Sequence, residues 1–268
     1  MNPSDQLVSP ALEDVHAAPD DRGIALDEAG VVGVPYPIEV TMASGERQQT
    51  IAEVAMNARL EATSRGVHMS RFVETLDANA ADVSPTGLIR IADETMRRLD
   101  SNEARVSFRF PFFLRRQAPA SGASSLARYE GLLAAHATTE ATTTSVTVIV
   151  PVTSLCPCSK EISDYGAHNQ RGELELAVDG SIWLEELVDY AEAAGSAPLY
   201  PLLKRPDERY VTMQAYDKPA FVEDMVRDVI RTLRDDSRVR RARVRARNQE
   251  SIHVHDAVAQ ARWSRDDV

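Results

Sequence analysis

The segment SLCPCSKEISDYGAHNQR, residues 154–171, separates two stretches with strand-like patterns. A β-branched run, 142–152, precedes it, and an alternating run, 172–178, follows it, so the segment is predicted to be a loop between strands. It holds both cysteines of the chain, Cys156 and Cys158, together with His168. Thiolate and imidazole are ligands that zinc-like ions prefer. The sequence therefore predicts metal-binding chemistry in a loop that follows a strand.

The length and composition of the chain exclude several classes of protein. With 268 residues and 43% hydrophobic residues, the chain can bury the core of one large domain or of two small ones. No apolar run approaches the roughly 18 residues of a membrane-spanning helix, so no membrane partner is expected. The formal net charge of −11 argues against a nucleic-acid partner but allows a small anionic substrate in a locally basic cleft.

The N-terminus and the cysteines indicate a compartment. Residues 1–30 are rich in Asp, Pro, Ala and Ser and are expected to form a disordered extension. Their acidic start lacks the basic and apolar regions of a secretory signal. Cys156 and Cys158 are separated by one proline, a spacing that does not suit a structural disulfide. We therefore expect a reduced, cytoplasmic compartment.

Hydrophobic periodicity predicts an α+β protein with two related halves. Alternating or β-branched runs predict strands at 36–42, 49–56, 106–113, 126–136, 142–152, 172–178 and 239–249. Helical spacing predicts helices at 70–76, 86–99, 181–194, 221–234 and 251–263. Ser70 is expected to cap the first of these helices and Ser181 the third. Each half then combines antiparallel strands with paired helices on one face.

A catalytic zinc-type site needs about three protein ligands and one open position. Cys156 and His168 supply two candidates, and the alternative is a small buried thiol beside an unrelated surface histidine. Cys158 is either a further ligand, a thiol beside the site or inert. The charged run 204–209 is either a solvated loop or the source of a third ligand, Glu208. In the second case its basic residues, which suit phosphate oxygens, lie near the metal: Lys204 and Arg205.

Acidic and imidazole side chains later in the chain also have two interpretations. Glu223 begins a predicted helix, where it either complements the helix dipole or accepts from two adjacent N–H groups of a guanine edge. His253 and His255 are either exposed and capping residues or include a general acid/base. The same two interpretations apply to His68, whereas His16 and His136 are assigned no function.

Five segments together are more specific than any one of them. In order and spacing they resemble the type IB GTP cyclohydrolase I family, and the resemblance runs from about Gly33 to Trp263. The segments are GVHMSRFVE (66–74), SLCPCSKEISDYGAHNQRG (154–172), LLKRPDERYVT (202–212), FVEDMVRDV (221–229) and SIHVHDA (251–257).

The resemblance implies the tunnelling fold, or T-fold: two tandem modules of antiparallel sheet with paired helices on one face. The modules are expected at 31–150 and 151–268, the second carrying most site residues. The resemblance also implies a homotetramer with sites at subunit interfaces. The implied activity is metal-dependent conversion of GTP and water to 7,8-dihydroneopterin triphosphate and formate, the first step of tetrahydrofolate biosynthesis. The implied cofactor is a divalent metal, Zn, Mn or Fe(II).

Matched position by position, the resemblance assigns three groups of residues. The metal ligands are Cys156, His168 and Glu208. Glu223 anchors the guanine, and His253 transfers protons alongside the catalytic Cys156. The candidates for the triphosphate are Lys160, Arg171, Lys204 and Arg205.

Two other functions compete with this interpretation. One is a T-fold relative that acts on a purine or pterin by a different reaction, because a fold alone does not fix function. The other is a non-catalytic binding protein whose thiols merely bind metal. A binding protein needs Glu223 but has no use for a metal ligand set with a proton-transfer histidine, so the co-occurrence of these residues favours the enzyme.

Overall fold

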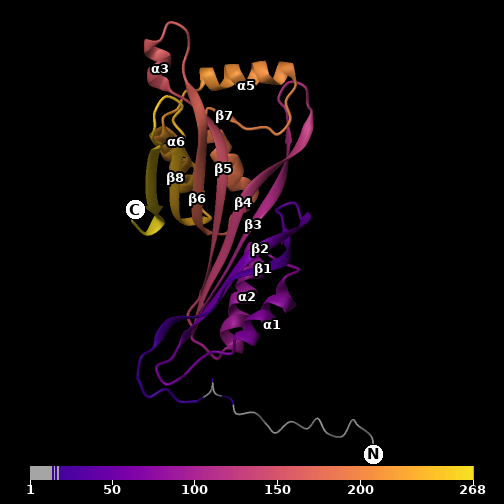
Figure 1. Ribbon diagram of the computed structural model, residues 1–268, viewed down its shortest axis with the longest axis vertical. Coiled ribbons are helices and arrows are strands. Elements are labelled where there is room, and N and C mark those ends of the chain that lie inside the picture. The colour runs from indigo at the N-terminus through magenta and orange to yellow at the C-terminus, as the bar shows by residue number, and fades with distance from the viewer. Residues whose placement is uncertain (1–13, 15, 17, 268) are drawn as a thin grey trace, which may run out of the picture.

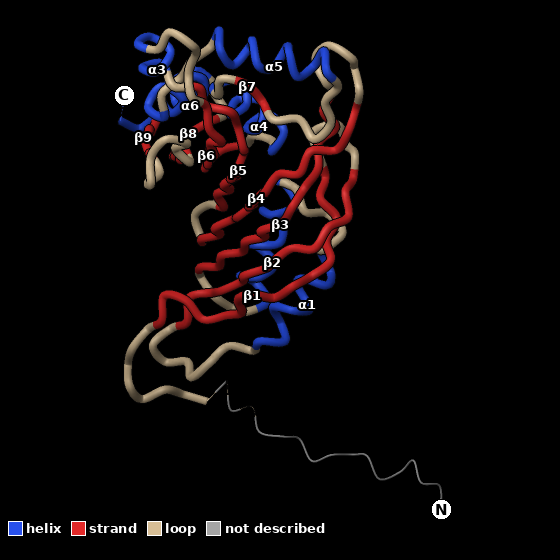
Figure 2. Tube along the Cα trace, turned by 45° about the horizontal axis from the view of Figure 1, so that its top comes forward, coloured by secondary structure: helices blue, strands red, loops and turns tan. Residues whose placement is uncertain are grey.

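The computed structural model describes residues 14, 16 and 18–267 and contains one continuous antiparallel sheet (Figures 1 and 2). Eight strands follow one another in the order β1-β2-β3-β4-β5-β6-β8-β9, and the two-residue β7 pairs with β5. Their bounds are β1 Leu26–Thr41, β2 Arg47–Leu60, β3 Glu103–Gln117, β4 Ser124–Thr138, β5 Thr142–Leu155, β6 Asn169–Gly180, β7 Ala197–Pro198, β8 Val239–Asn248 and β9 Ala257–Ser264. The α+β class predicted from the sequence is confirmed.

The helices divide between the two halves of the sheet (Figure 1). Helices α1 and α2 lie beside the first four strands, and α6 packs on β8 and β9 while α4 packs on β5. Helices α3 and α5 lie together at one end of the molecule, where β5 ends. The bounds are α1 Met69–Asn79, α2 Pro85–Arg98, α3 Pro157–Ile162, α4 Leu184–Ala194, α5 Arg205–Asp217 and α6 Val222–Asp235, followed by the short 3-10 helix η2 Arg265–Asp267.

The strand β5 shows why the sheet has one covered face. Its alternate residues are fully buried: Val146, Val148, Val150 and Val152. The residues between them are partly exposed, as the period of a strand with one buried face requires. Helix α6 contributes the matching apolar stripe, in which Val222, Met225, Val226, Val229 and Leu233 are buried. Helix α6 packs this stripe on β8 and β9 while α4 covers β5, and burial of the helices against the sheet stabilises this layer.

The two halves share one core. A single cluster of buried side chains includes residues of helices α1, α2, α4 and α6 and of strands β1 to β6 and β8. The order strand–strand–helix–helix–strand–strand occurs first from β1 to β4 and again from β5 to β9, with α3, β7 and α5 added to the second copy. The expected division between 150 and 151 falls inside β5, which pairs with β4 on one side and β6 on the other.

Several local predictions differ from the structure at the ends of elements. The expected disordered extension reached residue 30, but β1 begins at Leu26; residues 1–13, 15 and 17 lie outside the described residues. Helix α1 follows His68 rather than Ser70, and α4 follows Trp183 rather than Ser181. In both cases the chain enters the helix at a residue whose backbone is extended and whose side chain makes no capping hydrogen bond.

Two elements were predicted wrongly. The segment 251–263 was expected to be a helix, but it is a turn followed by β9, because Ala257, Ala259, Ala261 and Trp263 pack against the core with the period of a strand. The run 204–209 was given a solvated loop as its alternative, but it begins α5. No helix in the described part of the chain is long and apolar enough to cross a membrane.

Candidate functional site

Cys156 and His168 lie opposite each other where β5 and β6 end. Leu155 and Asn169 form the last paired positions of the two strands, and the next backbone contact is the Cys156 N–H donating to the His168 carbonyl at 3.1 Å. Both side chains are half-buried. Strand register therefore brings the backbones of Cys156 and His168 together, although a loop separates the two residues in the sequence.

The short helix α3 directs Cys156 and Cys158 differently. Cys156 immediately precedes α3, and its Sγ accepts a hydrogen bond of 3.4 Å from the Ser159 amide. The hydroxyl of Ser159 in turn accepts from the His168 amide at 3.2 Å, which closes the loop onto the helix. Cys158 lies within the first turn of α3 and is exposed. Both thiols are free, so neither is consumed by a disulfide.

One buried serine connects the ends of three strands with the start of α6. Ser154 Oγ donates to the Ala220 carbonyl at 3.0 Å and accepts from Gln170 Nε2 at 3.3 Å and from Asn248 Nδ2 at 3.0 Å. Gln170 Oε1 lies 2.9 Å from His168 Nδ1. Ser154 is therefore two residues before Cys156 in the chain, and the side-chain amide of Gln170 links it to His168 through hydrogen bonds.

Helix α5, whose first turn contains Glu208, lies over the same end of the sheet (Figure 1). A lysine fastens α5 to α3: Lys160 Nζ donates to the Tyr216 carbonyl at 2.6 Å and lies 4.3 Å from the centre of the Tyr216 ring. A cavity of about 580 Å³ separates α5 from the loop after α3, lined by Tyr165, Asn169, Met213 and Tyr216 among others. Its volume is in the range of small-molecule sites.

The first turn of α5 is held by Asp207, the neighbour of Glu208. Asp207 is fully buried, and its carboxylate accepts from the Ser121 hydroxyl at 2.6 Å and from the amides of Ala120, Ser121 and Lys204 at 2.7–2.8 Å. Burial acts to raise the pKa of Asp207, but the hydrogen bonds from Ser121 and the backbone outweigh it and hold the pKa well below its usual range. Asp207 is thus a buried carboxylate that stays ionised.

The donor set fits a zinc-type ion in chemistry, and two of its three members are adjacent. Thiolate, imidazole and carboxylate are all accepted by Zn²⁺. Cys156 and His168 are neighbours, whereas Glu208 is exposed on α5. Within the described part of the chain, these three residues do not form a group whose ligand atoms all lie within 4.8 Å of one another.

Glu223 and His253, the predicted guanine anchor and proton-transfer residue, are exposed. Glu223 is in the first turn of α6, three residues after the Ala220 carbonyl that Ser154 binds. His253 and His255 lie in the turn between β8 and β9, where their rings stack with centroids 5.0 Å apart. Ser251 in this turn places its Oγ 3.4 Å from His168 Nδ1. The turn therefore reaches the predicted metal ligand.

Comparison with known proteins agrees with this arrangement. The family described as type I GTP cyclohydrolase folE2 matches residues 12–259. The chain belongs to this FolE2 family. It is 44% identical over 252 residues to GTP cyclohydrolase FolE2 1 of Dechloromonas aromatica, covering 93% of this chain and 95% of that protein. It is also 44% identical over 261 residues to GTP cyclohydrolase FolE2 of Nitrosococcus oceani, covering 97% and 98%. The family resemblance drawn from the five segments is confirmed.

Solved structures with the same fold have unrelated sequences. Uricase from Arthrobacter globiformis superimposes on this FolE2-family chain with a TM-score of 0.53 at 9% identity, covering 90% of this chain and 94% of that one. A uricase from Bacillus fastidious gives a TM-score of 0.52 at 9% identity, covering 92% and 95%. At this identity the likeness concerns the fold alone, and it confirms the predicted tunnelling fold.

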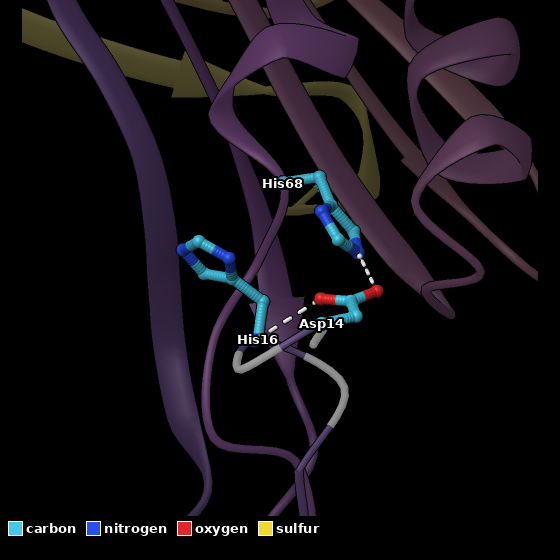
Figure 3. A group of neighbouring side chains, drawn as sticks. All are labelled: Asp14, His16 and His68. Carbon is cyan, nitrogen blue, oxygen red and sulfur yellow. Dashed lines mark hydrogen bonds and ion pairs between the residues drawn. The ribbon is translucent and has the colours of Figure 1, made fainter. Parts of the chain in front are cut away.

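A second group of ligand-type side chains in this FolE2-family chain lies at the opposite end of the molecule, where the chain enters α1 (Figure 1), and Figure 3 shows its side chains. Asp14 Oδ2 is 3.1 Å from His68 Nε2, and the His16 amide donates to Asp14 Oδ1 at 3.2 Å. The ligand atoms of all three residues lie within 4.8 Å of one another. From the sequence, His16 was assigned no function, and His68 was given both a structural and an acid/base interpretation. The contact between Asp14 and His68, the residue that precedes α1, accounts for the proximity of these side chains.

Sequence reasoning also missed the residues that support the predicted ligands of this family member: Ser154, Gln170, Asn248 and Asp207. Gln170 lay within the quoted loop, two positions after His168, but its partner Ser154 is on the other strand. Asp207 had a local signal, because an acidic residue three positions after Lys204 and next to Pro206 is typical of a helix start.

Proposed function

We propose that this FolE2-family chain is a metal-dependent GTP cyclohydrolase. It converts GTP and water to 7,8-dihydroneopterin triphosphate and formate, the first step of tetrahydrofolate biosynthesis. The observation that carries the proposal is the meeting of three elements at His168: Cys156 from the end of β5, Gln170 from β6, and the histidine-containing turn that reaches it through Ser251. A protein that only binds a purine has no use for this convergence.

Each residue has a role that its position supports. Cys156, His168 and Glu208 would hold a divalent ion, Zn, Mn or Fe(II). When bound, the ion lowers the pKa of water toward neutrality and so supplies the nucleophile for C8 of the purine. Glu223 accepts from adjacent N–H groups of the guanine edge and orients C8. His253 gives a proton to the ring nitrogen that becomes an amine as the imidazole ring opens.

The triphosphate needs cations that are free to bind it. Among the described residues, no hydrogen bond or ion pair engages the Arg171 or Arg205 guanidinium or the Lys204 ammonium, and all three residues are exposed. Arginine and lysine donors suit phosphate oxygens. Lys160, in contrast, is engaged with Tyr216, and we propose that it supports the triphosphate site indirectly by fixing α3 against α5.

We further propose that the enzyme is a cytoplasmic homotetramer with its sites at subunit interfaces. Large side chains are highly exposed in the segments that carry the site: Ile162 at the end of α3 is 84% exposed, Tyr165 in the following loop 101% and Val254 in the turn between β8 and β9 105%. Exposure of large apolar side chains to water is unfavourable, and burial at a subunit interface would remove it. Light scattering coupled to size-exclusion chromatography tests the assembly, and a monomer that is fully active would contradict it.

A metal reconstitution experiment tests the activity. Purified protein is stripped with a chelator and given GTP with Zn²⁺, Mn²⁺ or Fe²⁺, and the oxidised product is detected by its pterin fluorescence. Formation of neopterin with at least one metal supports the proposal. Folded oligomeric protein that forms none with any metal contradicts it and favours a different reaction or a non-catalytic role.

Two cysteine variants provide a matched control for the ligand assignment. Cys156→Ala is expected to abolish turnover and to weaken metal binding. Cys158→Ala removes the exposed thiol two residues away and is expected to leave both unchanged. Full turnover by Cys156→Ala would show that the ligand set is wrong.

A further inference from the structure

We infer that Gln170 is a positioning residue that fixes the hydrogen of neutral His168 on Nδ1 and leaves Nε2 as the metal-binding nitrogen. The inference rests on the proposed function in one respect, the assignment of His168 as a metal ligand. Its basis is a directed chain of hydrogen bonds in the buried core beneath the site. Ser154, Gln170 and Asn248 are 1%, 7% and 2% exposed, so water does not replace these contacts.

The Ala220 carbonyl determines which groups donate and which accept along this series of hydrogen bonds. A hydroxyl has one hydrogen to donate and two lone pairs that accept. Ser154 Oγ receives two amide groups, Gln170 Nε2 and Asn248 Nδ2, which occupy both lone pairs. Its hydrogen goes to the carbonyl of Ala220, 3.0 Å away, which can only accept.

The bond to Ser154 also determines the orientation of the Gln170 amide, and through it the donor and acceptor nitrogens of His168. Because Nε2 of Gln170 is used on Ser154, its Oε1 faces His168 Nδ1 at 2.9 Å. An amide oxygen only accepts, so the neutral imidazole must donate from Nδ1, and Nε2 carries the lone pair. The opposite orientation of the amide would take the Ser154 hydrogen from Ala220 and leave that buried carbonyl without it, which is unfavourable.

Strand register keeps this chain in place. Ser154 and Gln170 are directly paired positions of β5 and β6, and Gly172 is paired with Asn248 of β8. A Cβ atom at position 172 would lie 2.5 Å from Asn248 Oδ1, so the glycine makes the room in which the Asn248 amide reaches Ser154. The polar chain is thus built into three adjacent strands rather than into a mobile loop.

The arrangement has a consequence for metal binding. A partner that holds the second ring nitrogen fixes both the tautomer and the ring orientation of a ligating histidine, and loss of such a partner weakens metal binding by about 10- to 100-fold. The Ser251 hydroxyl lies 3.4 Å from Nδ1, a distance longer than that of a normal hydrogen bond, and Ser251 is exposed. We therefore assign the positioning role to Gln170 rather than to Ser251.

Three full-length variants test the inference. Gln170→Leu removes the acceptor, and Gln170→Glu keeps an oxygen facing Nδ1 as a conservative rescue. Asn79→Leu is a matched control, because Asn79 is also 7% exposed and hydrogen-bonded but lies in α1, in the other half of the chain. Co²⁺ affinity is measured by competition with a chromophoric chelator. The His168 tautomer is measured in metal-free protein by solid-state NMR of ¹⁵N-histidine, with the signal assigned through its loss in His168→Ala.

The expected result distinguishes a positioning role of Gln170 at His168 from a general effect on the stability of the fold. Gln170→Leu weakens Co²⁺ binding by roughly 10- to 100-fold and mixes the two tautomers, whereas Asn79→Leu stays near wild type in both measurements; Gln170→Glu, which keeps an acceptor at Nδ1 but loses the amide donor to Ser154, binds Co²⁺ more tightly than Gln170→Leu. Equal Co²⁺ affinity and an unchanged Nδ1–H signal in Gln170→Leu would overturn the inference. If His168→Ala binds Co²⁺ as well as wild type, the ligand assignment fails instead, and the metal-free NMR measurement still decides the role of Gln170.

Discussion

The carboxylate of Asp207 accepts a 2.6 Å hydrogen bond from the hydroxyl of Ser121, a residue 86 positions earlier in the chain. Ser121 lies in the turn between β3 and β4, and Asp207 lies in the first turn of α5. The same carboxylate accepts from the amides of Ala120 and Lys204. The first half of the chain therefore fixes the helix that presents Glu208, although the proposed site residues all come from the second half.

Asp207→Asn is expected to impair the site through the position of α5. An amide in place of the carboxylate aims N–H groups at backbone donors, so the turn at Ser121 separates from the helix. A displacement of about 1 Å at a ligand costs roughly 100-fold in rate, and we expect a fall in kcat/KM of that order. Ser121→Ala removes one of the donors and should have a smaller effect. Unchanged kinetics in Asp207→Asn would show that α5 is held by other contacts.

The pH dependence of stability has a defined sign at Asp207. Its folded pKa lies below the unfolded value of about 3.9, so the folded state binds its proton less readily. The contribution to stability is therefore complete above about pH 4 and is lost as the pH falls through the depressed folded pKa. Urea unfolding at pH 7 and near pH 3 measures this. The stability gap between wild type and Asp207→Asn should narrow at the lower pH, and a gap that widens would contradict the sign.

Lys160→Met distinguishes a clamp from a phosphate contact. As a clamp between α3 and α5, Lys160 stabilises the fold by about 1 kcal/mol through its charged hydrogen bond and its contact with the Tyr216 ring. We expect a lower melting temperature and little change in the KM for GTP. Arg171→Met is the comparison, because its guanidinium is exposed and proposed to bind the triphosphate. A large rise in KM for Lys160→Met, with unchanged stability, would instead indicate that Lys160 contacts the triphosphate directly.

Glu223→Ala is expected to abolish GTP binding while the metal site remains intact. Glu223 is exposed in the first turn of α6, so its removal leaves no buried partner unpaired. Titration calorimetry with GTP and the Co²⁺ competition assay measure the two functions separately. Asp228→Ala, on the same helix and ion-paired with Arg231 at 3.2 Å, is the control and should bind GTP normally. Loss of Co²⁺ binding in Glu223→Ala would place this carboxylate at the metal instead.

Local patterns were sufficient to predict most of the strands and helices and to single out Cys156 and His168 as candidate ligands. The alternation of β5 and the apolar stripe of α6 each lie within one stretch of sequence, and Cys156 and His168 face each other because one loop joins adjacent strands. The contacts of Ser154 with Asn248 and of Asp207 with Ser121 span 94 and 86 positions. No periodicity encodes such pairs, because they depend on the register of strands that only the folded sheet brings together.

His253 and His255 offer a matched pair for the proton-transfer step. Their rings stack with centroids 5.0 Å apart in one exposed turn, so either substitution removes the same stacking contact. Only His253 is proposed to reach the purine nitrogen, and loss of a general acid typically costs about 10²- to 10⁴-fold in rate. We expect kcat of His253→Ala to fall by that factor while GTP and Co²⁺ binding are retained. His255→Ala is expected to keep most of the wild-type kcat. Equal losses in both variants would mean that the stacked turn, rather than a proton from His253, supports turnover.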